Sequence, residues 1–542
     1  MTVLRRKAEG YRRHPIWISI AVSALMLAIL GAAELAARKY APVEGMPDFA
    51  QYLIDSSEPF FDSETVRGRE EMIQVPRHPG FPPIQRFALD KPAGLRRIVV
   101  IGESSAMILG WSLSAVAARN RLSQRIEIIN MAVGGSDLEQ TMRRFREALQ
   151  YAPNAIIVLF GHNLFLHHPT TEISGWPGMD RLRIVCLKSR LVSLLVEHRA
   201  MPTRPVGFQT QGRLLAFRES LSKMADEARR RGVRLALCTA PGNLHFPPRA
   251  EELVRWAPEF LEIKYLYWTG ERDAAMRKCQ LLLSHKPKAW WNFQLGEWLY
   301  QAGQYEKARR QLLAAQDGDT DRIRAITKVN ALIRAVSREK GLVLLDFDKQ
   351  VFKSALHGVP GWRDFMDSCH LRNVEFEAAE CLRVLGEVRN PGEIPKGFSQ
   401  GAPRQSQDKT LHSILGQALA AQNGRQGILM SLAQTYLSEF LVSGEEAIRA
   451  LRRTPRETAL LLSYVGEAFW TAGHRARAMR LNDEARRLAS GESELCLQRA
   501  LFHLGSGEKT EAARWLRLAL KLRPDQGEVR FYLSKLEAEG SA

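Results

Sequence analysis

Five short runs of apolar, largely β-branched residues restrict the folds that are open to this chain. They are Arg96–Gly102, Ile126–Asn130, Ala155–Gly161, Val233–Pro241 and Leu342–Phe347. Longer helix-compatible segments separate the first four, among them Leu138 to Leu149 and Leu214 to Arg231. Near-continuous apolar strands that alternate with helices are typical of a parallel sheet covered on both faces. We therefore predict an α/β fold, with its chemistry beyond the carboxyl ends of the strands.

A helical repeat fills the long gap between the fourth and fifth runs, and a second array lies near the C-terminus. In the first array, residues recur at a shift of 33: Gly270, Ala275 and Cys279 return as Gly303, Ala308 and Leu312. In the second, the shift is 34 and Pro524 closes the last unit: Gly473, Ala478 and Ala485 return as Gly507, Ala512 and Ala519. Both fit the tetratricopeptide pattern, in which the glycine lies at the turn between paired helices. The segment Ile428 to Arg453 matches poorly and is interpreted as a degenerate unit.

The N-terminal segment carries a membrane signal. Residues Ile16 to Ala33 form an uncharged apolar run of about the length that crosses a bilayer as a helix. Five basic residues precede it: Arg5, Arg6, Lys7, Arg12 and Arg13. The positive-inside rule then predicts a cytoplasmic N-terminus and the rest of the chain outside. The basic, Arg-rich chain with a short apolar leader resembles bacterial proteins, for which the outside of the inner membrane is the periplasm. We expect an uncleaved anchor; a cleaved signal peptide and a buried core helix stay open as alternatives.

The sequence divides into seven segments, because 542 residues are too many for one core. They are a basic segment and anchor (1–40), a proline-rich spacer expected to pack irregularly on the α/β domain (41–95), the first part of the α/β domain (96–250), inserted helical hairpins (251–325), the second part of the α/β domain (326–389), a linker (390–410) and a C-terminal helical domain (411–542).

Charge and cysteine content exclude several classes of function. The net charge is +18, but the sequence shows neither zinc-finger spacing nor an aromatic-basic RNA signature, so no nucleic-acid partner is expected. We interpret most of the basic excess as solvated surface. None of the six cysteines forms a CxxC pair, which disfavours a structural zinc site.

Polar and glycine residues follow the strands in a characteristic order. The first strand leads into Gly102-Glu103-Ser104-Ser105, the second into a turn with Gly134 and Gly135, and the third into Gly161-His162-Asn163. Beyond the fifth strand comes Asp367-Ser368-Cys369-His370. These elements resemble, in order, the four sequence blocks of the SGNH (GDSL-like) hydrolases. The resemblance covers roughly Arg96 to Leu385, with the repeat pair inserted, and it implies a flavodoxin-like three-layer fold.

The residue types in these blocks suit nucleophilic catalysis at an ester. A serine hydroxyl needs a neighbouring base, and His370 is the candidate base for Ser104. Asp367 can hold the second ring nitrogen of that histidine and stabilise the imidazolium. The developing oxyanion would meet the backbone N–H groups of Ser104 and Gly135 and the side-chain amide of Asn163. The matching residues have these roles in the SGNH family.

Several positions depart from the family pattern or leave a choice open. Glu103 stands where the family usually has aspartate, and Ser105 competes with Ser104 for the attack, although block alignment favours Ser104. We expect His162 and Asn243 to line the cleft rather than to catalyse, and His245, in the same segment as Asn243, to be either structural or a substrate contact. Cys369 is expected to be inert, with a bridge to Cys381 as a less favoured alternative.

The chain is therefore expected to be a membrane-anchored extracytoplasmic serine esterase that acts on an acyl ester, such as an O-acetyl group of a polysaccharide. One alternative is a polysaccharide O-acyltransferase that uses the same triad. Another is a scaffold that binds a partner protein through its repeats. The proposed mechanism requires no cofactor and no metal ion.

Overall fold

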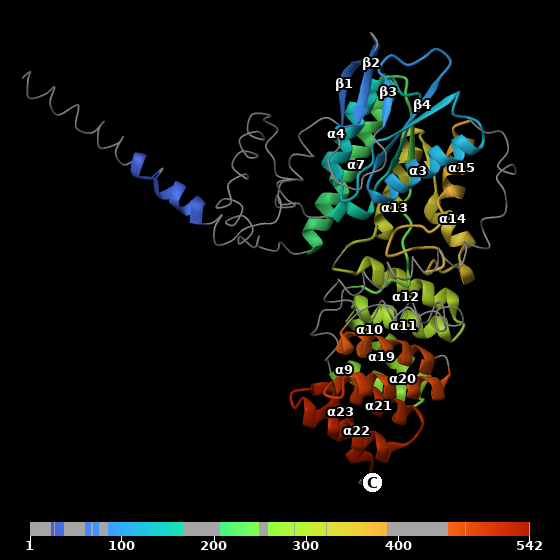
Figure 1. Cartoon of the computed structure of the whole chain (residues 1–542). Helices are drawn as coiled ribbons and strands as arrows, with labels where there is room; N and C mark the ends of the chain where they lie inside the picture. The colour runs from blue at the N-terminus through green and yellow to red at the C-terminus, as the bar shows by residue number, and fades with distance from the viewer. Residues whose placement is uncertain are drawn as a thin grey trace, which may run out of the picture. The chain divides into compact units, whose positions relative to one another are not determined.

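The structure is a computed structural model of the chain (Figure 1), and it describes eleven ranges. These are residues 23–26, 28–36, 60–66, 69–74, 85–165, 206–248, 258–286, 288–320, 322–386, 454–471 and 473–540. The chain forms two compact units. One comprises Met1–Asp90 with His167–Gln209, and the other comprises Lys91–Leu166 with Thr210–Ala542.

The first unit contains a small antiparallel sheet in the order β1-β2-β3, formed by Phe61–Val66, Arg69–Gln74 and Arg86–Ala88. The expectation of irregular packing for 41–95 is therefore wrong for these residues. Phe61, Met72 and Phe87 are buried, and the rings of Phe61 and Phe87 meet edge to face at 4.9 Å. The sequence pattern did not predict these strands, because most of their other residues are charged or polar and the apolar alternation of a strand is weak.

The predicted anchor, Ile16 to Ala33, lies mostly outside the described residues. Its described part is helical over residues 23–26 and 28–36, with exposed apolar side chains such as Leu25 and Ile29. Within the ranges given above, no helix has both the length and the apolar character needed to cross a membrane.

The second unit is built on the predicted parallel sheet. Its five strands are β4 (Arg96–Gly102), β5 (Ile126–Asn130), β6 (Ala155–Leu159), β7 (Arg234–Cys238) and β8 (Val343–Leu345). Their order in the sheet is β5-β4-β6-β7-β8, and every pair is parallel. In chain order this is 2-1-3-4-5, the flavodoxin-like arrangement that the sequence predicted. Four residues in the middle of β4, Ile98 to Ile101, are fully buried, as expected for a central strand with both faces covered.

Helices cover both faces of the sheet. They are α3 (Ser104–Arg119), α4 (Leu138–Ala148), α7 (Val206–Arg230), α13 (Thr327–Lys340), α14 (Phe347–Ser354) and α15 (Glu375–Val384), with short 3-10 turns η1 (Leu149–Tyr151), η2 (His162–Phe165) and η3 (Leu356–Gly358). The crossover through α3 runs toward β5, whereas those through α4, α7 and α13 run the opposite way. Right-handed crossovers therefore place α3 on one face and the other three on the second face. The helix α15 packs beside α3.

The helical repeats have the predicted form. The insert comprises α9 (Pro258–Trp268), α10 (Arg272–His285), α11 (Ala289–Gln301) and α12 (Tyr305–Asp317). The C-terminal array comprises α19 (Pro455–Thr471), α20 (Arg475–Leu488), α21 (Ser493–Gly505), α22 (Lys509–Leu522) and α23 (Gly527–Gly540). The recurring glycines lie at the turns between paired helices with positive φ angles, from +74° at Gly303 to +95° at Gly270. Only glycine adopts this conformation without strain, which explains its recurrence. The linker and the segment Ile428 to Arg453 lie outside the described residues.

The two repeat arrays contact each other. The insert's helix α9 packs against α21 and α23, and the Lys264 ammonium lies 2.7 Å from the Glu528 carboxylate. Tyr265 donates a hydrogen bond of 2.8 Å to Glu539. Trp268 belongs to the same buried cluster as the apolar residues of the C-terminal helices. The inserted and C-terminal hairpins therefore share a core.

Candidate active site

Two of the predicted blocks meet at the carboxyl edge of the sheet. Ser104 is the first residue of α3, directly after β4, and its Oγ lies 2.7 Å from Nε2 of His370. The other ring nitrogen, Nδ1, lies 2.6 Å from Oδ2 of Asp367. The His370 and Asp367 side chains are 22% and 25% exposed, so the relay is sheltered and still open to a substrate. Ser104, His370 and Asp367 thus form one continuous hydrogen-bonded chain.

The loop that carries Asp367 and His370 is fixed by its own hydrogen bonds. Oδ1 of Asp367 accepts the backbone N–H groups of Cys369 and His370, each at 2.9 Å. The backbone of Met366 donates to the carbonyl of His370 at 2.8 Å. The three-residue spacing of Asp and His therefore allows one carboxylate to hold both the turn and the imidazole.

The pKa values of the relay follow from this pairing. Burial alone lowers the pKa of His370, but hydrogen bonds to Asp367 and Cys369 and their charges raise it to about 10. Burial raises the pKa of Asp367, yet its bonds to His370 and to two backbone N–H groups leave it below the usual value. The pair thus favours an aspartate beside an imidazolium, the charge state that forms when the serine loses its proton.

Three residues are expected to supply donors for an oxyanion: Ser104, Gly135 and Asn163. The backbone N–H of Ser104 is at the N-terminus of α3, where the first N–H groups have no partner within the helix. Gly135 has φ +74°, and a side chain at Gly134 would approach Cβ of Ser104 to 3.7 Å. The amide nitrogen of Asn163 donates to the carbonyl of Ser136 at 3.1 Å, which orients the side chain and uses one of its two N–H groups.

Glu103, which stands in the sequence where the SGNH family usually has aspartate, fixes the backbone of the third block, Gly161 to Asn163. Its buried carboxylate accepts the backbone N–H groups of Gly161, His162 and Asn163 at 3.2, 2.8 and 2.7 Å. Burial raises the pKa of Glu103 to about 7, although these three bonds oppose the shift. The available signal was an acidic residue at the end of a buried strand, because such residues are almost never fully buried without partners.

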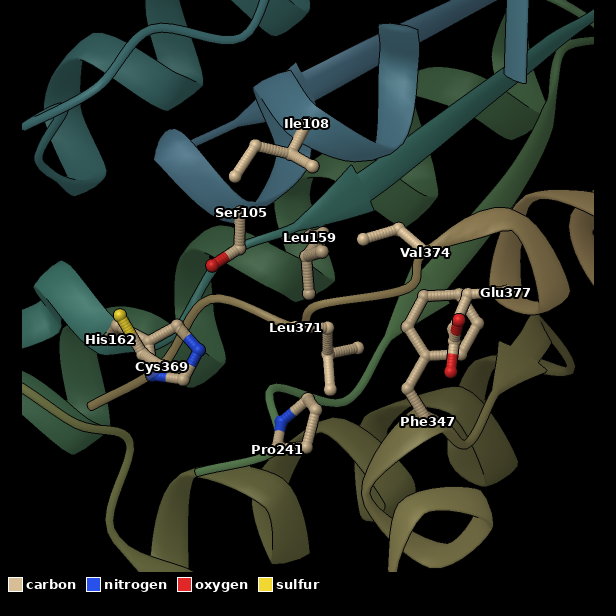
Figure 2. Close-up of a pocket in the computed structure, with 10 residues that line it drawn as sticks. All are labelled: Ser105, Ile108, Leu159, His162, Pro241, Phe347, Cys369, Leu371, Val374 and Glu377. Atoms are coloured by element: carbon tan, nitrogen blue, oxygen red, sulfur yellow. The ribbon is translucent and has the colours of Figure 1, made fainter. Parts of the chain in front are cut away.

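The two adjacent serines face different surroundings. Ser104 bonds to His370, whereas the buried hydroxyl of Ser105 has no hydrogen-bond partner among the described residues. Ser105 lines a cavity of about 20 Å³ (Figure 2), with room for roughly one water molecule. The hydroxyl points toward the end of the cavity where His162 and Cys369 lie, and Glu377 lies at the other end. The geometry therefore pairs the base with Ser104.

The remaining candidates divide between the cavity and the interior. His162 is buried and lines this cavity. Burial lowers its pKa to about 3, and its Nδ1 accepts the backbone N–H of Ala325 at 3.0 Å. Asn243, expected to line the cleft, is instead fully buried, and this expectation is wrong; His245 is buried as well, which fits a structural residue. Asn243 donates to the carbonyl of Asp367 at 2.9 Å, and His245 bonds to Glu297 at 2.7 Å. Neither contact was visible in the sequence, because both partners are distant along the chain.

The cysteines of the site are thiols. Cys369 is buried, with its sulfur 3.8 Å from Nδ1 of His370, and the alternative of a bridge to Cys381 is wrong because both are free. Within the described part of the chain, Asp367, Cys369 and His370 form a potential metal-binding set, whose ligand atoms lie within 4.8 Å of one another. Metal binding there would compete with the bond between His370 and Asp367.

No family model and no curated protein matches the sequence. Among solved structures, a GDSL-like lipase from Bacteroides thetaiotaomicron is 10% identical, with 54% of this chain and 87% of that chain covered and a TM-score of 0.26. LAE5, an α/β hydrolase enzyme from the metagenome of Lake Arreo in Spain, is 11% identical, with coverages of 54% and 95% and a TM-score of 0.27. The APC/C hetero-tetramer Cut9–Hcn1 is 10% identical, with coverages of 69% and 65% and a TM-score of 0.18. Because the TM-scores are low, the fold is assigned from the strand order.

Proposed function

We propose that this chain is a serine esterase of the SGNH kind that hydrolyses an acyl ester, such as an O-acetyl ester. The observation that carries the proposal is the chain of hydrogen bonds from Ser104 through His370 to Asp367, at 2.7 and 2.6 Å. The donors that we propose for the oxyanion are the backbone N–H groups of Ser104 and Gly135 and the side-chain amide of Asn163. This combination supplies both an activated nucleophile and stabilisation of developing negative charge.

The residues support a two-step reaction. The Ser104 oxygen attacks the acyl carbon while its proton passes to Nε2 of His370, and negative charge forms on the carbonyl oxygen. Collapse of this intermediate expels the alcohol, which takes the proton from His370. Water then attacks the acyl–Ser104 ester and gives its proton to His370. A second collapse releases the carboxylic acid and returns the proton to Ser104.

We further propose that the N-terminal run anchors the chain in a membrane, with the catalytic domain on the extracytoplasmic side. Support comes from the uncharged stretch Ile16 to Ala33 and from the cluster of basic residues before it. An esterase in that position has access to esters outside the cytoplasm, including those of exported polysaccharides.

The purified full chain is expected to hydrolyse a short acyl ester such as p-nitrophenyl acetate and to release acetate from an O-acetylated glycan. The measurement is product release, with NMR of the acyl group to distinguish free acid from a new ester. A new ester on an added sugar would identify an acyltransferase. Hydrolysis of no ester of any acyl length, together with no labelling by a fluorophosphonate, would refute both enzymatic functions and favour a protein-binding scaffold.

The rate is expected to rise with pH. A protonated imidazole cannot accept the serine proton, so the active form is the one with neutral His370. Because the pKa of His370 is raised to about 10, kcat/KM should increase through the neutral and mildly alkaline range. The slope should be about tenfold per pH unit well below that pKa. Measuring kcat/KM against pH with an uncharged ester tests this, and a flat profile across neutral pH contradicts it.

A further inference from the structure

The inserted repeats reach into the catalytic domain through one buried carboxylate. Glu297 lies on α11 and is 2% exposed, and its Oε1 lies 2.7 Å from Nδ1 of His245. Tyr300, on the same helix, packs edge to face on the imidazole with a centroid distance of 4.7 Å. His245 itself follows β7 of the sheet. The repeat hairpins and the α/β domain are thus joined by a side-chain pair in the interior.

The segment that carries His245 also holds the loop of the relay. The backbone N–H of His245 donates to Oδ1 of Asn243 at 3.0 Å, and this fixes the Asn243 side chain. Asn243 then donates through its amide nitrogen to the carbonyl of Asp367 at 2.9 Å and through its backbone to Ser368 at 3.0 Å.

Two further contacts join His245 and its neighbour to the start of the same loop. The backbone of Leu244 donates to the carbonyl of Pro360 at 2.9 Å. Gly361 lies so close to His245 that a side chain there would come within 2.6 Å of the ring. The imidazole of His245 therefore packs against the start of the loop at Gly361, while the Asn243 side chain holds the backbone of Asp367.

These contacts form a continuous path from the repeats to the nucleophile. It runs from Glu297 to His245, through Asn243 to Asp367, and on through His370 to Ser104. Stability alone accounts poorly for a buried carboxylate here, because apolar residues of similar volume often stabilise a core at least as well. A hydrogen-bonded pair does, however, fix the direction of both side chains.

We propose that Glu297 is a positioning residue, through which the inserted repeats hold Asp367 in line with His370. This inference rests on the proposed esterase function. The repeats thereby set the alignment of the relay. Small displacements of catalytic groups are costly, since a misplacement of about 1 Å can lower a rate about 100-fold.

The test compares Glu297→Ala with Glu306→Ala in the full chain. Glu306 lies on the next helix, α12, and is 70% exposed, so it serves as a matched glutamate without a contact to the core. Glu297→Ala should lower kcat by about ten- to 100-fold, with KM within about twofold of the wild type. The rise of kcat/KM should move to lower pH, because a displaced Asp367 no longer raises the pKa of His370. Glu297→Gln, which can still accept the His245 N–H, should recover most of kcat.

A Glu297→Ala variant that is folded and matches Glu306→Ala in kcat and pH profile would overturn the proposal. If Glu297→Ala does not fold, Glu297→Asp keeps the charge but shortens its reach, and an unchanged kcat and pH profile would overturn the proposal equally. The downfield proton NMR signal of the His370–Asp367 hydrogen bond gives a readout without a substrate. Its shift or loss in Glu297→Ala supports the positioning role even if no ester is hydrolysed, so failure of the esterase function remains distinguishable.

Discussion

Ser104→Ala is expected to abolish labelling by a fluorophosphonate and to lower kcat for ester hydrolysis by at least about 1000-fold, and toward about 10⁶-fold. The reason is geometric: the Ser104 hydroxyl is the one placed 2.7 Å from the imidazole of His370. Without that oxygen no acyl-enzyme forms, and only the oxyanion donors and substrate binding remain. The measurement is gel-based labelling together with steady-state kinetics on the purified full chain.

Ser105→Ala is the matched control for this prediction. Its hydroxyl faces the cavity rather than the imidazole, so the variant should be labelled as the wild type is. Loss of labelling in Ser105→Ala, with retention in Ser104→Ala, would reverse the assignment of the nucleophile. Retention in both single variants and in the double variant would mean that neither serine reacts with the probe.

Asn163→Ala should lower kcat by about 100- to 1000-fold, the usual effect of removing one donor from an oxyanion hole. KM should change little, because the ground-state carbonyl carries less charge than the tetrahedral intermediate. The Asn163 side chain is oriented by its hydrogen bond to the Ser136 carbonyl, and the Asn163 backbone N–H is held by a hydrogen bond to the Glu103 carboxylate. Steady-state kinetics with a short acyl ester measures the two constants separately.

Asn120→Ala controls for the loss of an amide. Asn120 lies at the other end of α3 from Ser104, and its side chain donates a local hydrogen bond of 2.8 Å to the carbonyl of Val116. We expect its kcat to stay within about twofold of the wild type, in line with the small effects of substitutions away from functional features. Equal activity of Asn163→Ala and Asn120→Ala would remove Asn163 from the oxyanion hole and leave only backbone donors there.

The sequence was informative where local pattern determines structure. Apolar runs predicted the five parallel strands to within a few residues, because a buried central strand needs an almost unbroken apolar sequence. The spacing of Asp367 and His370 predicted their contact, since three residues suffice to close the turn. Gly270 and Gly303 were predicted at turns, and their positive φ angles confirm it.

Local sequence patterns do not predict contacts between segments that are distant along the chain. The hydrogen bond of His245 to Glu297 joins residues 52 positions apart, one in the loop after β7 and the other on the repeat helix α11. No sequence periodicity relates the two positions. Glu103 was recognised as unusual, but its backbone partners lie about 60 residues away. The small sheet of β1 to β3 was not predicted for a different reason. Its strands are mostly polar, so they are stabilised by pairing with neighbouring strands and show no apolar pattern that a sequence can reveal.

The separation of Ser104 from His370 by 266 positions has a consequence for how activity arises during synthesis. The ribosome synthesises the serine long before its base, because four strands of the parallel sheet (β5 to β8) and the inserted hairpins lie between them in the sequence. Contacts so far apart in sequence form late, because the intervening chain has to be ordered first. A nascent or truncated chain that ends before β8 therefore carries a serine with no base to activate it. The proposed relay is complete only when β8 and the loop after it have docked, so an unfinished chain lacks it.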